Sequence, residues 1–470
     1  MYHQRQDYDS DAWDLNDEVA SASMKQLSCT SVCDEIVAVV AAHFGATAWV
    51  VTPLRMGAYN MLYRVGVSVN GLERDVMVRV PCPNLSQFPQ EKTLQEVATI
   101  QQLRQNTALK VPECLHSGSE TFGPFILLPF IRNSGDMSDA FSKPREDSNE
   151  VPVLDKDIDE DLLKELYSKM TVCLIQLWQA EFPRIGSLRE ENGGLSVASR
   201  PLTLNMSNMV QLAKIPRCIL PPEKRTYDTA DEWYTALAEL HIAQLVFQHN
   251  DLVASEEDCR DKYVSRILFR RLAKEGKISS FGFAEDKWSA QSRHLTALCP
   301  AAKSNWGFRL WCDDLRPNTF LVDEFNDIVS VIDWELTYSA PTQFILDPPW
   351  WLLLDVPEMW SAGLQDWTTK FEIRLETWIS SMDMAEAAAS LNVLPFKLSE
   401  YMRESWTTGR FWLSYAARKS WAFDAVYWNY LDERFFGKRM DDGPLWKCRL
   451  ALLTRSNLCN ERWKNPRSIS

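Results

Sequence analysis

The chain has 470 residues, of which 46% are hydrophobic and 24% are charged, and its formal net charge is −14. This length suffices for two or three domain-sized units, and the composition is typical of a folded globular protein. The acidic balance repels polyanions, so it argues against a general nucleic-acid-binding role. It does not exclude ATP, which needs only a few local cations and a metal ion.

The beginning of the chain and the cysteines favour a cytoplasmic protein. The first residues are polar and acidic, unlike a signal peptide, and the most apolar stretch, residues 36–51, is too short to cross a bilayer. The eleven cysteines show no paired framework and no metal-binding spacing. We therefore expect reduced thiols, no membrane segment and a cytoplasmic location.

Residues 1–28 are acidic and predict a flexible N-terminal arm, and residues 29–131 predict a small α+β unit. Asp34 is placed to cap a short helix that Gly45 ends. Asn70-Gly71 predicts a tight hairpin, because both residues tolerate positive φ. The expected strands, rich in valine and aromatic residues, and the helix before the last strand cover residues 48–54, 59–69, 74–80, 92–104 and 125–131.

A larger, mainly helical unit is predicted over residues 161–470. The polar, acid-rich residues 132–160 before it have no periodicity and predict a flexible insertion. Most of the nineteen tryptophans lie in the larger unit, which favours aromatic core packing over a ligand cage. Helical patterns cover residues 162–178, a segment opened by a capping box at Thr229, residues 263–272, and most of residues 350–463.

Residues 308–349 carry the acidic side chains best placed for chemistry. An apolar strand leads into a loop with Asp314, and a hairpin turning near Asn326-Asp327 leads to Asp333. Because a hairpin returns the chain to its starting point, we expect Asp314 and Asp333 at the same end of the ribbon. One carboxylate can accept a hydrogen bond from an attacking hydroxyl while the other holds magnesium against ATP. A single Asp is more often a turn or cap residue, so this prediction depends on the whole pattern.

The segment Asp314-Leu-Arg-Pro-Asn-Thr-Phe-Leu-Val-Asp323, followed by Val331-Ile-Asp-Trp-Glu335, resembles the aminoglycoside phosphotransferase family. Leu310-Trp-Cys-Asp-Asp314 and Pro348-Pro-Trp-Trp351 are similar to a branch common in filamentous fungi. The resemblance implies an α+β, protein-kinase-like fold with a small β-rich N-lobe and a large, mainly helical C-lobe. It also implies ATP-dependent transfer of the γ-phosphoryl group to a hydroxyl of a small molecule.

Two aspartates carry the central roles that the resemblance implies. Asp314 matches the catalytic aspartate, and Asp333 matches the metal-binding aspartate. The family's second metal ligand, an Asn five residues after the catalytic position, is replaced by Thr319, with Asn318 one place earlier. A hydroxyl is a weaker magnesium ligand than an amide oxygen, so Asn318 and Thr319 are both candidates for the metal site. Asp313 adds a like charge that we expect to raise an apparent pKa of the pair.

The nucleotide-binding residues also follow from the resemblance. Gly57 matches the turn that covers the nucleotide, although it suits an ordinary hairpin equally well. Arg79 matches the cation that holds the α- and β-phosphates, and Glu96 matches the helix acid that pairs with it; the alternative is a solvated surface pair. Phe130 and Ile131 match the linker whose backbone would bind adenine.

Two functions remain open on this basis. The first is a magnesium- and ATP-dependent kinase for a small-molecule hydroxyl acceptor, and the second is a catalytically weak or inactive nucleotide- or ligand-binding protein. A protein kinase is disfavoured, because the sequence has no His-Arg-Asp loop, no Asp-Phe-Gly and no activation segment ending in Ala-Pro-Glu.

Overall fold

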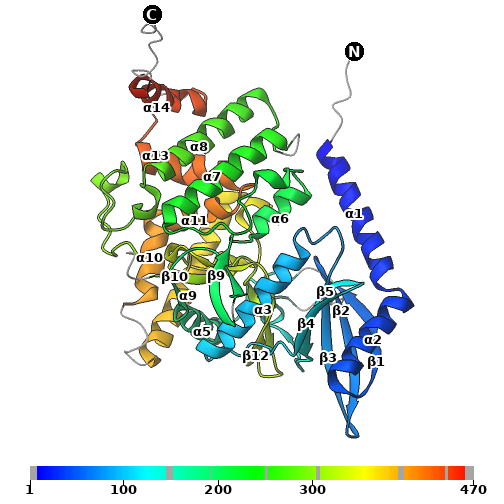
Figure 1. Ribbon diagram of the computed structural model, residues 1–470. Helices are drawn as coiled ribbons and strands as arrows, with labels where there is room; N and C mark the ends of the chain where they lie inside the picture. Colours follow the sequence, from blue (N-terminus) through cyan, green and yellow to red (C-terminus); the bar gives the residue numbers. More distant parts are fainter. Residues whose placement is uncertain are drawn as a thin grey trace, which may run out of the picture.

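The computed structural model describes residues 8–143, 152–191, 193–248, 252–302, 307–389, 396–439 and 443–460. An antiparallel sheet with few helices forms one side of the molecule, and a larger, mainly helical body forms the rest (Figure 1). The α+β fold expected from the sequence, with a small β-rich lobe and a large, mainly helical lobe, is confirmed, and its likeness to protein kinases stays a prediction. No single helix among the described residues is long and apolar enough to span a membrane; the first two helices, bent by 59° at their junction, meet that test only as a pair.

The first lobe is built on a five-stranded sheet in the order β1-β2-β3-β5-β4. The predicted Asn70-Gly71 hairpin is confirmed, with positive φ at both residues. Alternate valines of the central strands face a core that is closed on one side by α2. The strands are β1 (Thr47–Met56), β2 (Asn60–Val69), β3 (Leu72–Pro81), β4 (His116–Glu120) and β5 (Gly123–Pro129).

Two helices precede the sheet, and both differ from the sequence prediction. The helix α2 (Thr30–Phe44) ends at Gly45 as expected, but it begins after Cys29, so Asp34 lies inside it and is not its cap. Residues Tyr8–Leu27 form the helix α1 where we expected a flexible arm. Its polar composition concealed an apolar side that buries Leu27 against the first lobe.

The helix α3 (Pro89–Asn106) runs between the sheet and the second lobe (Figure 1). Its existence is confirmed, but Leu94, which the helical spacing of apolar residues would place on the buried side, is 39% exposed. Polar residues take part in its buried side instead, among them Lys92, Gln95, Glu96 and Thr99. A helix that buries charged residues must offer them partners, because an unpaired buried charge is costly.

The predicted insertion at residues 132–160 is only partly irregular. Asp136 caps the short helix α4 (Met137–Phe141), whose Met137 and Phe141 are buried. The strand β6 (Gly135–Asp136) pairs with β11 (Phe320–Val322) of the second lobe. The prediction of a flexible segment is therefore wrong for these residues, whose elements are too short to give a periodic pattern. Residues 144–151 of the insertion lie outside the described residues.

The second lobe packs its helices around small antiparallel sheets. Trp233, Trp334, Trp367 and Trp378 are almost fully buried in its core, as expected for packing residues. The helices are α5 (Glu160–Trp178), α6 (Leu204–Gln211), α7 (Ala230–Phe247), α8 (Glu256–Lys274), α9 (Leu364–Ala388), α10 (Leu398–Thr408), α11 (Arg410–Arg418), α12 (Phe423–Val426), α13 (Asp432–Phe436) and α14 (Leu445–Asn460). The strands are β7 (Glu181–Phe182), β8 (Ser187–Glu191), β9 (Gly194–Ser199), β10 (Phe308–Cys312), β11 (Phe320–Val322), β12 (Ile328–Val331) and β13 (Thr337–Ala340).

Candidate active site

Two loops of the second lobe, one after β10 and one after β12, carry the predicted aspartates and lie side by side. The backbone N–H of Ile332 donates to the carbonyl of Thr319 at 2.9 Å. The thiol of Cys312 lies 3.7 Å from the carbonyl oxygen of Asp333. The hairpin between the loops turns at Asn326, which has a φ of 56°. The fold therefore brings Asp314 and Asp333 to one end of the ribbon.

Asp314 is partly buried, and its carboxylate lies 3.1 Å from Nε of Arg316. Burial raises the pKa of Asp314 to about 6; Arg316 opposes this rise, and Asp333 and Glu335 add to it. A carboxyl group with this pKa is a poor base in acid and a competent one near neutral pH. Arg316 received no role from the sequence, although it lies only two positions after Asp314.

Asp313 has a structural role. Its carboxylate accepts hydrogen bonds from Nε1 of Trp311 at 2.8 Å and from the backbone N–H of Leu204, at the start of α6, at 3.1 Å. An acidic group at a helix N-terminus is favourable there. The pKa of Asp314 is raised mainly by burial, with Asp333 and Glu335 adding to the rise, and the neighbouring Asp313 is not among its causes.

Arg79, on β3, joins the first lobe to the aspartate loops. The residue is 5% exposed, and its guanidinium contacts Glu96 of α3. Its Nη1 donates to Oδ1 of Asp333 at 2.6 Å, and its Nη2 lies 3.2 Å from Oε2 of Glu335. The Arg79–Glu96 pair is thus a buried ion pair and not a solvated surface pair.

Lys92, Asn60 and Glu335 belong to the same cluster, and the sequence prediction missed all three. Glu335 accepts hydrogen bonds from Nζ of Lys92 at 2.5 Å and from Nδ2 of Asn60 at 3.0 Å. Burial alone would raise the pKa of Glu335, but Lys92 and Arg79 together lower it to about 2. The sequence held a signal for the burial of Lys92. Lys92, Glu96 and the apolar Ile100 are spaced four residues apart, so they lie on one side of the helix, and this side is predicted to be buried.

The three predicted metal ligands differ in their exposure to solvent. The side chain of Asp333 is 41% exposed despite its bond to Arg79, and Asn318 is exposed. Thr319 is 1% exposed, and its hydroxyl donates to the carbonyl of Arg316 at 2.9 Å. Thr319 therefore holds the loop together, and of the two neighbouring candidates Asn318 is the one open to a metal ion.

The donor set fits magnesium. Asp333 and Asn318 offer oxygen ligands, and magnesium typically takes one or two carboxylates together with substrate phosphates. Two cations, Arg79 and Lys92, are shared among three carboxylates of this cluster, those of Glu96, Asp333 and Glu335. Among the described residues, no group of three or more His, Cys, Asp or Glu side chains is placed to hold a metal ion.

The turn between β1 and β2 lies over the junction of the lobes. The hydroxyl of Tyr59 donates to Oδ1 of Asn208 on α6 at 3.2 Å, so this turn contacts the second lobe. Gly57 does not have a left-handed backbone, and a Cβ there would only touch the carbonyl oxygen of Asn60 at 3.7 Å. The geometry of the turn does not require glycine, and its role in covering a nucleotide stays a prediction.

The linker residues Phe130 and Ile131 directly follow β5. The N–H of Phe130 donates to the carbonyl of Asp75 at 3.3 Å, and the carbonyl of Ile131 accepts a bond from Asn133 at 2.9 Å. The N–H of Phe130 is thus engaged within the lobe. The carbonyl of Ile131 keeps a second lone pair for a donor such as the adenine amino group.

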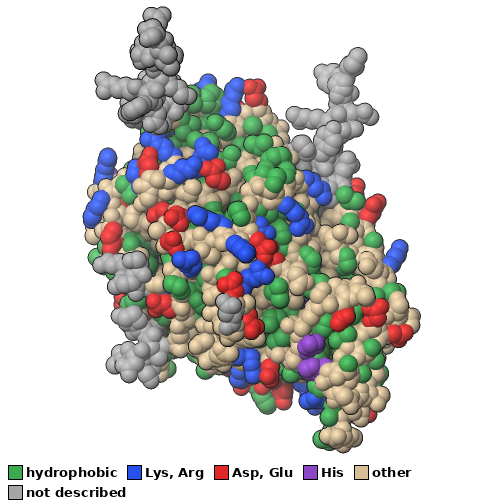
Figure 2. Space-filling model, viewed as in Figure 1, with side chains coloured by type: hydrophobic (Ala, Val, Ile, Leu, Met, Phe, Trp, Pro, Cys, Tyr) green, Lys and Arg blue, Asp and Glu red, His purple; other side chains and the backbone are tan. Residues whose placement is uncertain are grey.

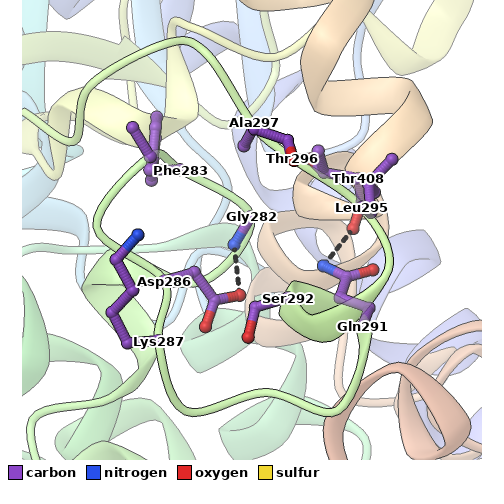
Figure 3. A pocket seen from close by; sticks show the side chains of 11 residues that line it. Gly282, Phe283, Asp286, Lys287, Gln291, Ser292, Leu295, Thr296, Ala297 and Thr408 are labelled. Carbon is purple, nitrogen blue, oxygen red and sulfur yellow. Dashed lines mark hydrogen bonds between the residues drawn. The ribbon is translucent and has the colours of Figure 1, made fainter.

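The cavity in Figure 3 is separate from the aspartate loops. It has a volume of about 80 Å³ and lies between the chain around Asp286 and the end of α10 at Thr408. The Asp286 carboxylate accepts bonds from the N–H of Gly282 and the hydroxyl of Ser289, so it stabilises the loop. On the described part of the face in Figure 2, acidic and basic side chains are interspersed.

Comparison with known proteins gives structural neighbours only. No family model matches the chain, and no curated protein matches its sequence. A fructosamine-3-kinase structure from Haemophilus somnus 129PT is 11% identical, with a TM-score of 0.38, over 83% of this chain and 95% of that one. Wild-type aminoglycoside 2'-phosphotransferase-IIIa in complex with GDP is 12% identical, with a TM-score of 0.36, over 91% of this chain and 99% of that one. At these values the similarity carries no weight for function, so the site must be judged by its own geometry.

Proposed function

We propose that the protein is an ATP-dependent phosphotransferase that transfers the γ-phosphoryl group to a hydroxyl of a small molecule. The observation that supports this most strongly is the pairing of Arg79 with both Glu96 and Asp333, directly beside the loop of Asp314. This arrangement supports the proposal because it brings together a candidate phosphate-binding cation, a candidate metal ligand and a candidate base at one junction between two lobes.

Each group has a role in the proposed step. The acceptor oxygen forms a bond to the γ-phosphorus while the bond from that phosphorus to the bridging oxygen breaks and ADP leaves. Asp314 accepts the hydroxyl proton, and Arg79 and Arg316 stabilise negative charge on the phosphates. Magnesium, when bound by Asp333 and Asn318, neutralises further phosphate charge. Positioning and charge stabilisation are the main protein contributions to phosphoryl transfer.

One observation favours the second candidate function, a catalytically weak or inactive binding protein. Arg79 is already neutralised by carboxylates, one of which, Asp333, is also the proposed metal ligand. A nucleotide must compete with these contacts, which opposes binding unless the metal ion releases Asp333.

A thermal-shift screen separates the two functions. Magnesium-ATP should raise the melting temperature, and a hydroxylated metabolite that raises it further is then tested for ADP release. Stabilisation by magnesium-ATP without turnover over a broad acceptor panel would favour the binding protein. No stabilisation by any nucleotide would contradict both functions.

A further inference from the structure

Glu335 belongs to the second lobe, yet the donors around it belong to the first. It is 5% exposed, and its Oε2 accepts bonds from Asn60 on β2, Arg79 on β3 and Lys92 on α3. These three donors are themselves 5–8% exposed. A buried carboxylate that serves three donors from three elements can move away from them only if all of these bonds break together.

A second ion pair joins the same helix to the second lobe. Arg200 follows β9, and its Nε and Nη2 donate to the two carboxylate oxygens of Glu91 at 3.1 Å and 2.9 Å. The side chains of this pair are both 10% exposed. Because Glu91 and Lys92 are consecutive residues, α3 is held against the second lobe at two adjacent points. Only one of these points, Lys92–Glu335, also touches Arg79.

Because Glu335 contacts Arg79, its pairing with Lys92 affects the position of Arg79. The guanidinium of Arg79 forms ion pairs with the carboxylates of Glu96, Asp333 and Glu335. Lys92 supplies Glu335 with a positive charge of its own at 2.5 Å. Without Lys92, Glu335 would draw the Arg79 guanidinium toward itself and away from Asp333, because a buried carboxylate needs a cationic partner.

We propose that Lys92 and Glu335 are positioning residues that tie the lobes together and keep Arg79 directed at Asp333 before any nucleotide binds. The proposal rests on the proposed phosphotransferase function for its kinetic consequence, but its structural consequence is independent of that function. The Arg79–Glu96 pair is then permanently assembled, and nucleotide binding does not have to order α3.

Four variants test the proposal: Lys92→Met, Glu335→Gln, the double variant that combines them, and Arg200→Gln as the matched control. Each single variant leaves a buried charge without its partner and should lower kcat/KM for ATP about 10- to 100-fold: in Lys92→Met the unpaired Glu335 draws Arg79 toward itself, and in Glu335→Gln the unpaired Lys92 repels Arg79. The double variant leaves neither charge and should recover part of that loss. Arg200→Gln should loosen α3 but keep kcat/KM within about twofold of the wild type, because Arg200 does not contact Arg79.

Hydrogen exchange of the α3 amides provides a readout that needs no activity. Exchange should become faster in Lys92→Met, Glu335→Gln and Arg200→Gln than in the wild type. Unchanged α3 exchange in both Lys92→Met and Glu335→Gln would overturn the tie between the lobes, whether or not the wild type has turnover. An equal loss of kcat/KM in Arg200→Gln and Lys92→Met would overturn the positioning of Arg79. If the wild type has no turnover but the α3 amides exchange faster in the variants, the phosphotransferase function is rejected. The role of Lys92 and Glu335 in holding the lobes together is then still supported.

Discussion

Asp314 combines partial burial with a nearby cation, and its protonation state should control the reaction. Its pKa is raised to about 6, mainly by burial. Below that value the carboxyl group is protonated and cannot accept the proton of the acceptor hydroxyl. We therefore expect kcat/KM to rise about tenfold per pH unit up to pH about 6 and then to level off. Initial rates across this range check the prediction, and a flat profile would contradict the role of Asp314 as the base.

The same shift in pKa predicts a change in stability. The pKa of Asp314 in the folded protein lies above that of an exposed aspartate, so its stabilising contribution is present in acid and is lost as the pH rises through about 6. Asp314→Asn should abolish transfer and yet raise the free energy of unfolding by about 1–3 kcal/mol at neutral pH. Denaturant titrations should show this gain at neutral pH and its disappearance below the pKa of an exposed aspartate. If the wild type and Asp314→Asn were equally stable at neutral pH, burial would not disfavour the charged form of Asp314.

The sequence revealed residues whose neighbours lie close along the chain and missed those paired across the lobes. Asp314 precedes the first strand of the β11–β12 hairpin and Asp333 follows the second, so their proximity could be derived. Lys92 and Glu335 are 243 positions apart, and no local pattern links them. Thr319 looked like a metal ligand because its hydroxyl lies near the right position, but only the folded loop shows that this hydroxyl bonds the Arg316 carbonyl.

At the scale of elements, the loop between β10 and β11 holds two metal-ligand candidates that differ in exposure. Asn318 is exposed, whereas the buried Thr319 bonds within the loop. Asn318→Ala should raise the magnesium concentration needed for ATP binding several-fold, about the loss expected for one weak ligand. Thr319→Val should leave the magnesium requirement unchanged and lower the free energy of unfolding by about 1 kcal/mol through the lost hydrogen bond.

Calorimetric titrations of ATP at several magnesium concentrations, together with unfolding curves, check both parts of this prediction. The two variants serve as controls for each other, because they change neighbouring positions of one loop. If Thr319→Val raised the magnesium requirement more than Asn318→Ala does, the metal-binding role would belong to Thr319.

Element prediction succeeded where one pattern dominates. The Asn70-Gly71 hairpin and the helix α5 have strong local signals, a left-handed turn and a continuous apolar side. The helix α1 and the short helix α4 do not, because one is polar over most of its surface and the other spans a single turn. Their formation depends on contacts with other elements, such as the bond from Ser23 to the carbonyl of Pro83 at 2.6 Å.

At the scale of the whole molecule, the site exists only because two lobes meet. Arg79 and Glu96 come from the first lobe, and Asp314 and Asp333 from the second. The fold class was predictable from the order of strands and helices. The way the lobes are fastened, through Glu335 and through Arg200, was not, because it depends on burial of charges that look solvated in the sequence.

The central claim is that Asp333 and Arg79 form a magnesium-nucleotide site at this junction, and calorimetric titration of magnesium-ATP into the wild type and Asp333→Ala tests it most directly. We predict measurable binding to the wild type and a loss of about tenfold or more in the variant, because the variant lacks the metal-binding carboxylate. Removal of magnesium by a chelator should weaken binding to the wild type and change little in the variant. Equal, magnesium-independent affinity of the two proteins would contradict the claim.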